Sequence, residues 1–250
     1  MKPHLSRYWL NTKETDPVVF QHQVEIVCDT YATAEDNYAA GIHTVSTDEM
    51  TGIQALERIT PTKPVRPGQV EKREFEYERH GTQTLIANFE VATGEVILPT
   101  IGDRRTEMDF AQHIARTVAT DPDAEWVFVV DQLNTHMSET LVQVVAADEC
   151  GVDEALGTKG KQGILKSMDT RRAFLTDLTH RVRFVYVPKH SSWLNQIEIW
   201  FSILMRRLLK RASFTSTEDL QMRILAFIDY FNRTLAKPFK WTYTGRPLQA

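Results

Sequence analysis

Three acidic residues stand where carboxylates commonly hold divalent cations. Asp48 closes the β-branched run IHTVSTD at residues 42–48, and Asp131 closes the almost wholly apolar run EWVFVVD at 125–131. Glu198 lies near the start of a long helical pattern. In open α/β sheets ligands gather at the carboxyl ends of strands, and a buried acid there is costly unless it is paired or bound to a cation. Three such carboxylates would suit Mg²⁺ or Mn²⁺, and two ions would support an in-line phosphoryl displacement.

Each acid alone also has a simpler interpretation. Asp48 would serve equally as a capping or turn acid, Asp131 as a structural acid at a strand end, and Glu198 as a solvated surface acid. The conjunction of the three, and the residues around each, favour a site.

The elements that must position these acids form a mixed α/β pattern. Alternating or continuous apolar runs predict strands at 42–48, 82–91, 95–101, 125–131 and 181–188. Helical spacing predicts helices at 106–119 with Thr106 as N-cap, at about 138–147, at 170–180, at 191–211 with Ser191 or Ser192 as cap, and at 216–234 with a capping box at Ser216 or Thr217. A helical lead-in ends at Gly41, and residues 57–74 fit an exposed loop.

The predicted 191–211 helix has one apolar stripe, formed by Leu194, Ile197, Phe201, Leu204 and Leu208. Glu198 lies at the edge of this stripe, and the arginines that follow lie on other faces. We therefore expect the helix to pack on the sheet with its single carboxylate directed toward the strand ends.

The charge distribution points to a polyanionic partner. Residues 1–150 carry a net charge of −13, whereas residues 181–250 carry +8. A basic C-terminal third indicates either a surface that faces a polyanion or merely a solvated helix face. The two cysteines, Cys28 and Cys150, have no metal-type spacing, which argues against a zinc ribbon or a disulfide scaffold. No run of 18 apolar residues and no secretory signal occur, so we expect a cytoplasmic protein with no membrane partner.

The segments around the acids resemble a known family. HTVSTDEMTGIQALER surrounds Asp48, WVFVVDQLNTH surrounds Asp131 and VYVPKHSSWLNQIEIWFSIL surrounds Glu198. They are similar to the three acidic motifs of the DDE transposases of bacterial insertion sequences, in the branch related to the mariner-like superfamily. The resemblance spans roughly residues 40–235. It implies a ribonuclease-H-like fold, a triad of Asp48, Asp131 and Glu198 that binds Mg²⁺ or Mn²⁺ (two ions), and DNA cleavage and strand transfer without a covalent enzyme intermediate.

Two features depart from the family pattern. Glu198 lies 67 residues after Asp131, a longer spacing than usual, so we place an insertion at about 149–182. Asp169 and Asp177 are rival third acids, but neither lies in a Leu-Asn-x-x-Glu context. In addition, only 47 residues precede Asp48, which is short for the family's N-terminal helix-turn-helix region. We predict a lead-in at 1–40 that is a remnant of that region, a catalytic domain at 41–212 and a helical C-terminal extension at 213–250.

Several neighbours of the acids are candidates for supporting roles. Asn134 and His136 would orient Asp131, contact DNA or cap the following helix, and Asn195 would hydrogen-bond near the site. Glu49 is expected to point to the opposite face of its strand from Asp48 and to be structural. The candidates for phosphate contact are basic: Lys189, His190, Arg206, Arg207, Lys210 and Arg211.

Three functions follow from this resemblance. The first is a transposase that acts on transposon ends and target DNA as a homodimer or larger assembly, because end synapsis needs at least two subunits. The second is a nuclease of the same fold that transfers nothing. The third is a truncated copy that binds DNA or inhibits a full-length relative.

Overall fold

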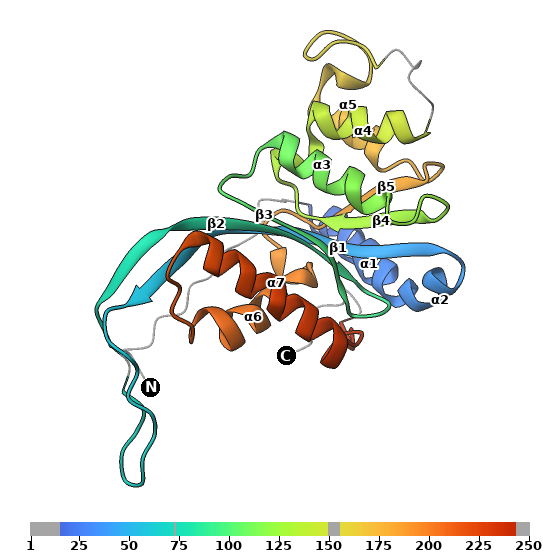
Figure 1. The fold of residues 1–250 in the computed structure, drawn as a ribbon. Coiled ribbons are helices and arrows are strands. Elements are labelled where there is room, and N and C mark those ends of the chain that lie inside the picture. Colours follow the sequence, from blue (N-terminus) through green and yellow to red (C-terminus); the bar gives the residue numbers. More distant parts are fainter. Residues whose placement is uncertain (1–15, 73, 150–155, 244–250) are drawn as a thin grey trace.

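The computed structural model describes residues 16–72, 74–149 and 156–243, and its centre is one five-stranded sheet (Figure 1). The strand order is β3-β2-β1-β4-β5. The strands are β1 (Ile42–Arg58), β2 (Tyr77–Glu90), β3 (Val96–Gly102), β4 (Glu125–Val130) and β5 (Val182–Tyr186). β1 pairs antiparallel with β2 and parallel with β4, and β4 is parallel to β5. The mixed sheet flanked by helices that the sequence predicts is confirmed.

Helices cover both faces of this sheet (Figure 1). Helices α3 (Glu107–Val118), α4 (Glu139–Glu149) and α5 (Met168–Leu175) lie on one side. Helices α1 (Pro17–Ala32), α6 (Ile197–Leu204) and α7 (Thr217–Thr234) lie on the other, with the short α2 (Ala34–Ala39) leading into β1. Two buried cores correspond to the two faces, and the strand pleat divides the side chains between them: Phe128 and Val130 enter the α3 side, Val129 the α6 side.

Two of the predicted helix caps, at Thr106 and Ser216, are present in the structure. The Thr106 hydroxyl accepts from the Asp109 N–H, and the Asp109 carboxylate accepts from the Thr106 N–H, which completes a capping box at α3. The Ser216 hydroxyl accepts from the Asp219 N–H at the start of α7. These ends are set by contacts within four residues, so they can be read from the sequence.

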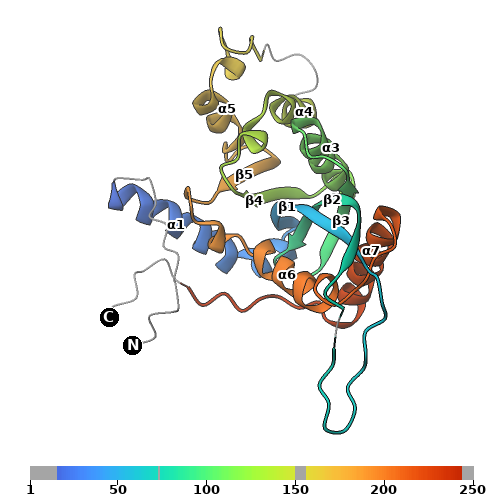
Figure 2. The same cartoon turned by 90° about the vertical axis from the view of Figure 1, so that its left-hand side faces the viewer.

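The prediction that Asp48 ends the first strand is wrong. β1 continues for another ten residues to Arg58, because the antiparallel ladder with β2 extends as far as Arg58↔Tyr77. Of the region predicted as an exposed loop at 57–74, only Glu57 and Arg58 lie in β1, and residues 59–72 are exposed as predicted. They form the tip of a two-stranded arm of β1 and β2, which projects beyond the body of the molecule (Figures 1 and 2). Asp48 is nevertheless special within β1, because parallel pairing with β4 stops at Ser46↔Val129.

The predicted single helix at 191–211 is also wrong. The chain forms a 3₁₀ turn at Ser192–Leu194, an extended residue at Asn195, α6 at Ile197–Leu204 and a π-helical turn at Met205–Leu209. Neither Ser191 nor Ser192 caps α6. The periodic apolar pattern is continuous, but buried hydrogen bonds between Asn195 and β1 override it and separate the two helical pieces.

Two segments belong to the predicted domain division, the lead-in at 1–40 and the insertion at 149–182. Residues 1–15 of the predicted lead-in and 150–155 of the predicted insertion lie outside the described residues. Between 156 and 181 the chain forms a 3₁₀ turn at Ile164–Lys166 and then α5. The division at 40 and 212 stays a prediction. Among the described helices, none is long and apolar enough to cross a membrane.

Candidate metal and DNA site

The three predicted acids come together at one edge of the sheet. Asp48 follows the last parallel pair of β1 with β4, and Asp131 follows the end of β4 directly. Glu198 lies in the first turn of α6. Asp131 is the shared neighbour, because its negative charge raises the pKa of Asp48 and that of Glu198. Parallel strands end together, so β1 and β4 bring two carboxylates to the same place and α6 adds the third.

Asp48 is the most buried of the three, with 8% of its surface exposed. Its Oδ1 accepts from the Glu49 N–H at 2.8 Å, and its Oδ2 accepts from the Asn195 side-chain amide at 3.2 Å. Burial, and then the charge of Asp131, raise the pKa of Asp48 to about 7. Its negative charge is therefore unfavourable where it lies, unless a cation balances it.

Asp131 is held by His136. The imidazole Nδ1 forms an ion pair with Asp131 Oδ1 at 2.7 Å and donates to the Asp131 carbonyl oxygen at 3.2 Å, and Nε2 donates to Glu49 Oε2 at 3.2 Å. Burial opposes charge on His136, but the hydrogen bonds to Asp131 and Glu49 outweigh it and raise its pKa to about 10. Burial likewise opposes charge on Asp131, yet the hydrogen bond from His136 holds the Asp131 pKa below its usual range. Glu49 lies on the face of β1 opposite Asp48, as predicted, and holds His136 in place.

Glu198 stands at the open side of the group. Its side chain is exposed, and among the described residues none donates a hydrogen bond to its carboxylate. Partial desolvation, and then the charge of Asp131, raise the pKa of Glu198. A carboxylate in this state is available to an incoming cation.

The donor set fits a hard divalent cation. All three groups are carboxylates, which are the ligands that Mg²⁺ and Mn²⁺ prefer. Asp131 Oδ1 is occupied by His136 and the Leu133 N–H, whereas Asp131 Oδ2 accepts no hydrogen bond from the described residues. The mutual repulsion that raises two of the three pKa values is what a bound cation would relieve. Asp131 Oδ2 and the Glu198 carboxylate are therefore open to a cation, whereas each Asp48 oxygen already accepts one hydrogen bond and has its second lone pair left for a metal.

Two of the three predicted supporting residues contact the acids. His136 and Asn195 contact triad acids directly, with both side chains fully buried. Asn134 lies exposed in the 3₁₀ turn at Asn134–Met137 and contacts neither Asp131 nor the start of α4 within the described structure. The Ser138 hydroxyl instead accepts from the Leu141 N–H at the start of α4.

The six predicted phosphate contacts form two groups. Lys189 and His190 line a hollow of about 430 Å³ together with Asp131, beside the triad. Arg206 and Arg207 line a different hollow of about 480 Å³ with the end of α7, and none of the three acids lines it. Arg211 lines a further hollow with Arg206 and Arg207, and both Lys210 and Arg211 are exposed. Of the six predicted phosphate contacts, only Lys189 and His190 thus share a hollow with one of the acids, Asp131.

Some residues of the site were not predicted. The Ser46 hydroxyl donates to Asn195 Oδ1 and accepts from the Ile197 N–H at 2.9 Å. The Tyr31 hydroxyl donates to the Leu194 carbonyl oxygen at 3.0 Å. No local sequence signal marks these two residues as part of the site. Ser46 merely lies on the same face of β1 as Asp48, and Tyr31 on the apolar side of α1.

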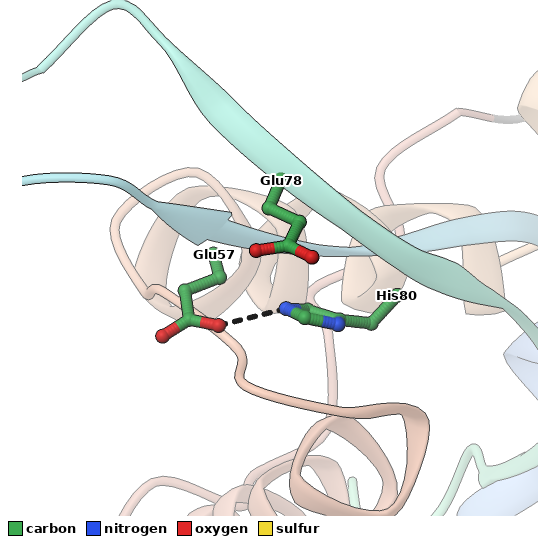
Figure 3. A group of neighbouring side chains, drawn as sticks. All are labelled: Glu57, Glu78 and His80. Carbon is green, nitrogen blue, oxygen red and sulfur yellow. Dashed lines mark hydrogen bonds and ion pairs between the residues drawn. The ribbon is translucent and has the colours of Figure 1, made fainter.

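A second group of potential metal ligands lies away from the triad. In the part of the chain that the structure describes, Glu57, Glu78 and His80 are the one group of three such side chains with ligand atoms all within 4.8 Å of one another (Figure 3). Glu57 and Glu78 are opposite each other in the β1–β2 ladder, and His80 Nε2 lies 2.7 Å from Glu57 Oε2. The group lies on the arm and is partly exposed. The ion pair between His80 and Glu57 is enough to explain why these side chains lie close together. The triad carboxylates are spaced more widely than these.

Comparison with known proteins gives a family and several similar structures. The family model described as DDE superfamily endonuclease matches residues 43–221. Solved structures that resemble the chain include the Mos1 mariner paired end complex with Mn, at 13% identity and a TM-score of 0.48, covering 92% of this chain and 60% of that one. The catalytic domain of Mos1 mariner transposase is 12% identical with a TM-score of 0.44, covering 88% and 85%. No curated protein matches the sequence.

The extent of the family match settles the classification. It runs from the start of β1 to the start of α7 and includes all three acids. The chain spans about 60% of the length of the transposase in the paired end complex. Because the model covers well over half of its residues, this chain belongs to the DDE superfamily endonuclease family.

Proposed function

We propose that this chain is the catalytic domain of a mariner-like insertion-sequence transposase, which cleaves DNA at transposon ends and transfers the strand to a target. The observation that carries the proposal is the convergence of Asp48, Asp131 and Glu198, with Asp131 acting electrostatically on both other acids. The family membership of residues 43–221 supports it.

The three acids would hold Mg²⁺ or Mn²⁺, as two ions. When bound, such ions activate an attacking oxygen and stabilise the leaving oxygen of an in-line phosphoryl displacement. The chain itself supplies orientation. His136 fixes one oxygen of Asp131 and leaves the other free, while Asn195 and the Glu49 N–H fix Asp48. Catalysis of phosphoryl transfer depends mainly on such positioning and on charge neutralisation.

DNA would be bound by two basic regions. Lys189 and His190 would contact the phosphates next to the scissile bond, because they share a hollow with Asp131. Arg206, Arg207, Lys210 and Arg211 would contact the backbone further away, on the exposed side of the π-helical turn and the residues after it. Such contacts give affinity that is independent of sequence and falls with salt.

Nicking of supercoiled plasmid in Mn²⁺ tests the assignment of the acids. We expect Asp131→Asn and Glu198→Gln each to lower the nicking rate more than about 100-fold, because a metal site supplies several kcal/mol. Asp169→Asn, at a rival acid exposed on α5, is the matched control and should keep the parent rate. Nicking by the Asp131→Asn or Glu198→Gln variant at the parent rate would remove that residue from the triad.

Incubation with precut transposon ends and a target plasmid tests the second step. Joined products would support strand transfer by a dimer or larger assembly, whereas nicking without joining would favour a nuclease of the same fold. A folded chain that binds DNA but neither nicks nor joins would favour an inhibitory fragment. Co-purification with a full-length relative, and reduced transposition in its presence, would then be the decisive observation.

A further inference from the structure

Helix α1 packs into the half of the molecule that carries Glu198. Its buried residues Val24, Val27, Cys28 and Tyr31 join the same core as Trp200 and Phe201 of α6. The family match begins at residue 43, after α1. A segment outside the matched region is thus part of the core behind the acids.

The Tyr31 hydroxyl lies where α6 begins. It donates to the Leu194 carbonyl oxygen at 3.0 Å and accepts from the Gln196 N–H at 3.3 Å. These two backbone groups flank the extended residue Asn195, at the break between the 3₁₀ turn and α6. A buried backbone group left without a partner costs about 1–3 kcal/mol. The Tyr31 hydroxyl therefore stabilises this irregular turn, because it pairs two backbone groups that have no partner within a helix. Tyr31 itself is only 5% exposed.

The same turn carries the contacts to the catalytic acids. Asn195 donates from its side-chain amide to Asp48 Oδ2 at 3.2 Å and to the Thr47 carbonyl oxygen at 3.1 Å. The Glu198 N–H donates to the Asn195 carbonyl oxygen at 3.1 Å, within the first turn of α6. The Ser46 hydroxyl, which lies next to the Tyr31 phenol, bonds both Asn195 Oδ1 and the Ile197 N–H. Residues 194–198 are thereby held between α1 and β1.

We propose that Tyr31 is a positioning residue of the acidic site: its hydroxyl fixes residues 194–196, which set Asn195 against Asp48 and start the helix that carries Glu198. The inference rests on the proposed function, in which these acids hold the metal. It makes α1 a component of the catalytic unit. Displacing α1 would loosen two of the three acids without touching Asp131, which is held separately by His136.

Tyr31→Phe removes a single oxygen and keeps the ring that packs edge-on against Trp241. We expect the variant to bind Mn²⁺ more weakly and to nick plasmid more slowly, each by about 10–100-fold, the usual effect of losing a partner behind a metal ligand. The KM for DNA should stay at the parent value, because the basic residues lie elsewhere. Backbone amides at 194–198 should exchange hydrogen faster, which reads the local structure without metal or DNA.

Two further variants sharpen the test. Tyr38→Phe changes an exposed tyrosine on α2 and should match the parent in every measurement. Ser46→Ala removes the next link, and its effect on Mn²⁺ affinity should combine with that of Tyr31→Phe less than additively, since both act through Asn195. Should Tyr31→Phe fold poorly, Ser46→Ala alone tests the same path.

The outcomes separate this inference from the proposed function. Parent-like Mn²⁺ affinity and exchange at 194–198 in Tyr31→Phe, with only a lower melting temperature, would overturn the positioning role and leave the triad intact. Parent-like nicking by Asp131→Asn would overturn the triad, whereas the exchange measurement would still report whether Tyr31 fixes this turn.

Discussion

At the scale of single residues, three carboxylates of the same chemical type have three different surroundings. Asp131 is kept charged by His136, Asp48 is buried and pushed toward neutrality, and Glu198 is open to solvent. Asp131 therefore stays ionised, whereas Asp48 and Glu198 bind protons more readily and would be ionised by a bound cation. The supporting histidine is itself held by Glu49, an acid one residue from Asp48 on the other face of β1.

His113 should make folding stability depend on pH. It is fully buried in α3, and burial, with the charge of Arg116 second, lowers its pKa to about 3. Above the unfolded pKa of about 6.5 both states are neutral at this residue, so no stability is lost. As the pH falls through 6.5 toward 3 only the unfolded state binds the proton, so stability falls by up to about 1.4 kcal/mol per pH unit.

Urea unfolding at pH 7, 6 and 5 checks this expectation. His113→Gln should show a shallower loss of stability with falling pH than the parent. Thr100→Val is the matched control, because it removes the hydroxyl that lies 2.7 Å from His113 Nδ1 and keeps the imidazole. It should lower stability at every pH with the parent slope. Equal slopes in the parent and in His113→Gln would show that His113 is not buried in its neutral form.

At the scale of elements, β1 both carries the site and builds the arm. Its first half pairs with β4 and ends near Asp48, and its second half pairs only with β2. The ladder between β1 and β2 shifts register between Met50 and Ile53 and again between Ala55 and Leu56. Bulges of this kind bend and twist a strand, so the arm leaves the plane of the site while remaining part of the same strand.

The arm should be stabilised by removing one of its charges. Glu57 and Glu78 lie directly opposite each other, and like charges in that position destabilise an antiparallel pair. We expect Glu78→Gln to raise the free energy of unfolding by about 0.2–1 kcal/mol. Glu76→Gln, at the residue directly before β2, is the control and should change the free energy of unfolding less. A loss of stability in Glu78→Gln, measured by chemical denaturation, would mean that His80 stabilises the Glu78 carboxylate more than Glu57 destabilises it.

The turn between β2 and β3 depends on a glycine. Gly94 has φ +76°, and a Cβ there would lie 2.0 Å from the Lys237 carbonyl oxygen, in the segment after α7. We expect Gly94→Ala to lower the free energy of unfolding by about 2 kcal/mol or more, because of strain and displacement of that segment. Gly102→Ala, where a Cβ meets nothing within 4 Å, should change it by less than about 0.5 kcal/mol. Equal melting temperatures for the two variants would contradict the close contact.

At the scale of the whole molecule, charge is separated along the chain. The basic C-terminal third supplies the exposed arginines of the π-helical turn, whereas the acids of the site come mostly from the acidic remainder. Lys189 and His190, from the same basic third, line a separate hollow together with Asp131.

The salt dependence of DNA binding should report this surface. Replacing Arg206 and Arg207 together by Gln should lower the slope of log K against log salt by about 2, since each phosphate contact contributes roughly 1. Arg233→Gln is the matched control on α7, where the arginine is already paired with Asp229. Fluorescence anisotropy with a labelled duplex at several salt concentrations measures the slope. An unchanged slope in the double variant would place the DNA elsewhere.

The features that depend on neighbours along the chain can be predicted from the amino-acid sequence alone. The capping box at Thr106 and the cap at Ser216 use residues within four positions, and the apolar run before Asp131 marks a buried strand wherever it occurs. The motifs around the three acids indicate the family and the fold class. These signals are local, and local propensity is what a single sequence states most directly.

How the three acids are held depends on contacts between residues far apart in the chain. Asn195 meets Ser46 across 149 residues of chain, Tyr31 meets Leu194 across 163, and His136 meets Glu49 across 87. These buried contacts break the helix that the apolar pattern predicts, because leaving buried polar groups without partners costs more than interrupting a helix at one residue. The continuation of β1 past Asp48 has a similar cause, since its partner β2 is distant in sequence. Long-range hydrogen bonding, which no local pattern encodes, set the geometry of the site.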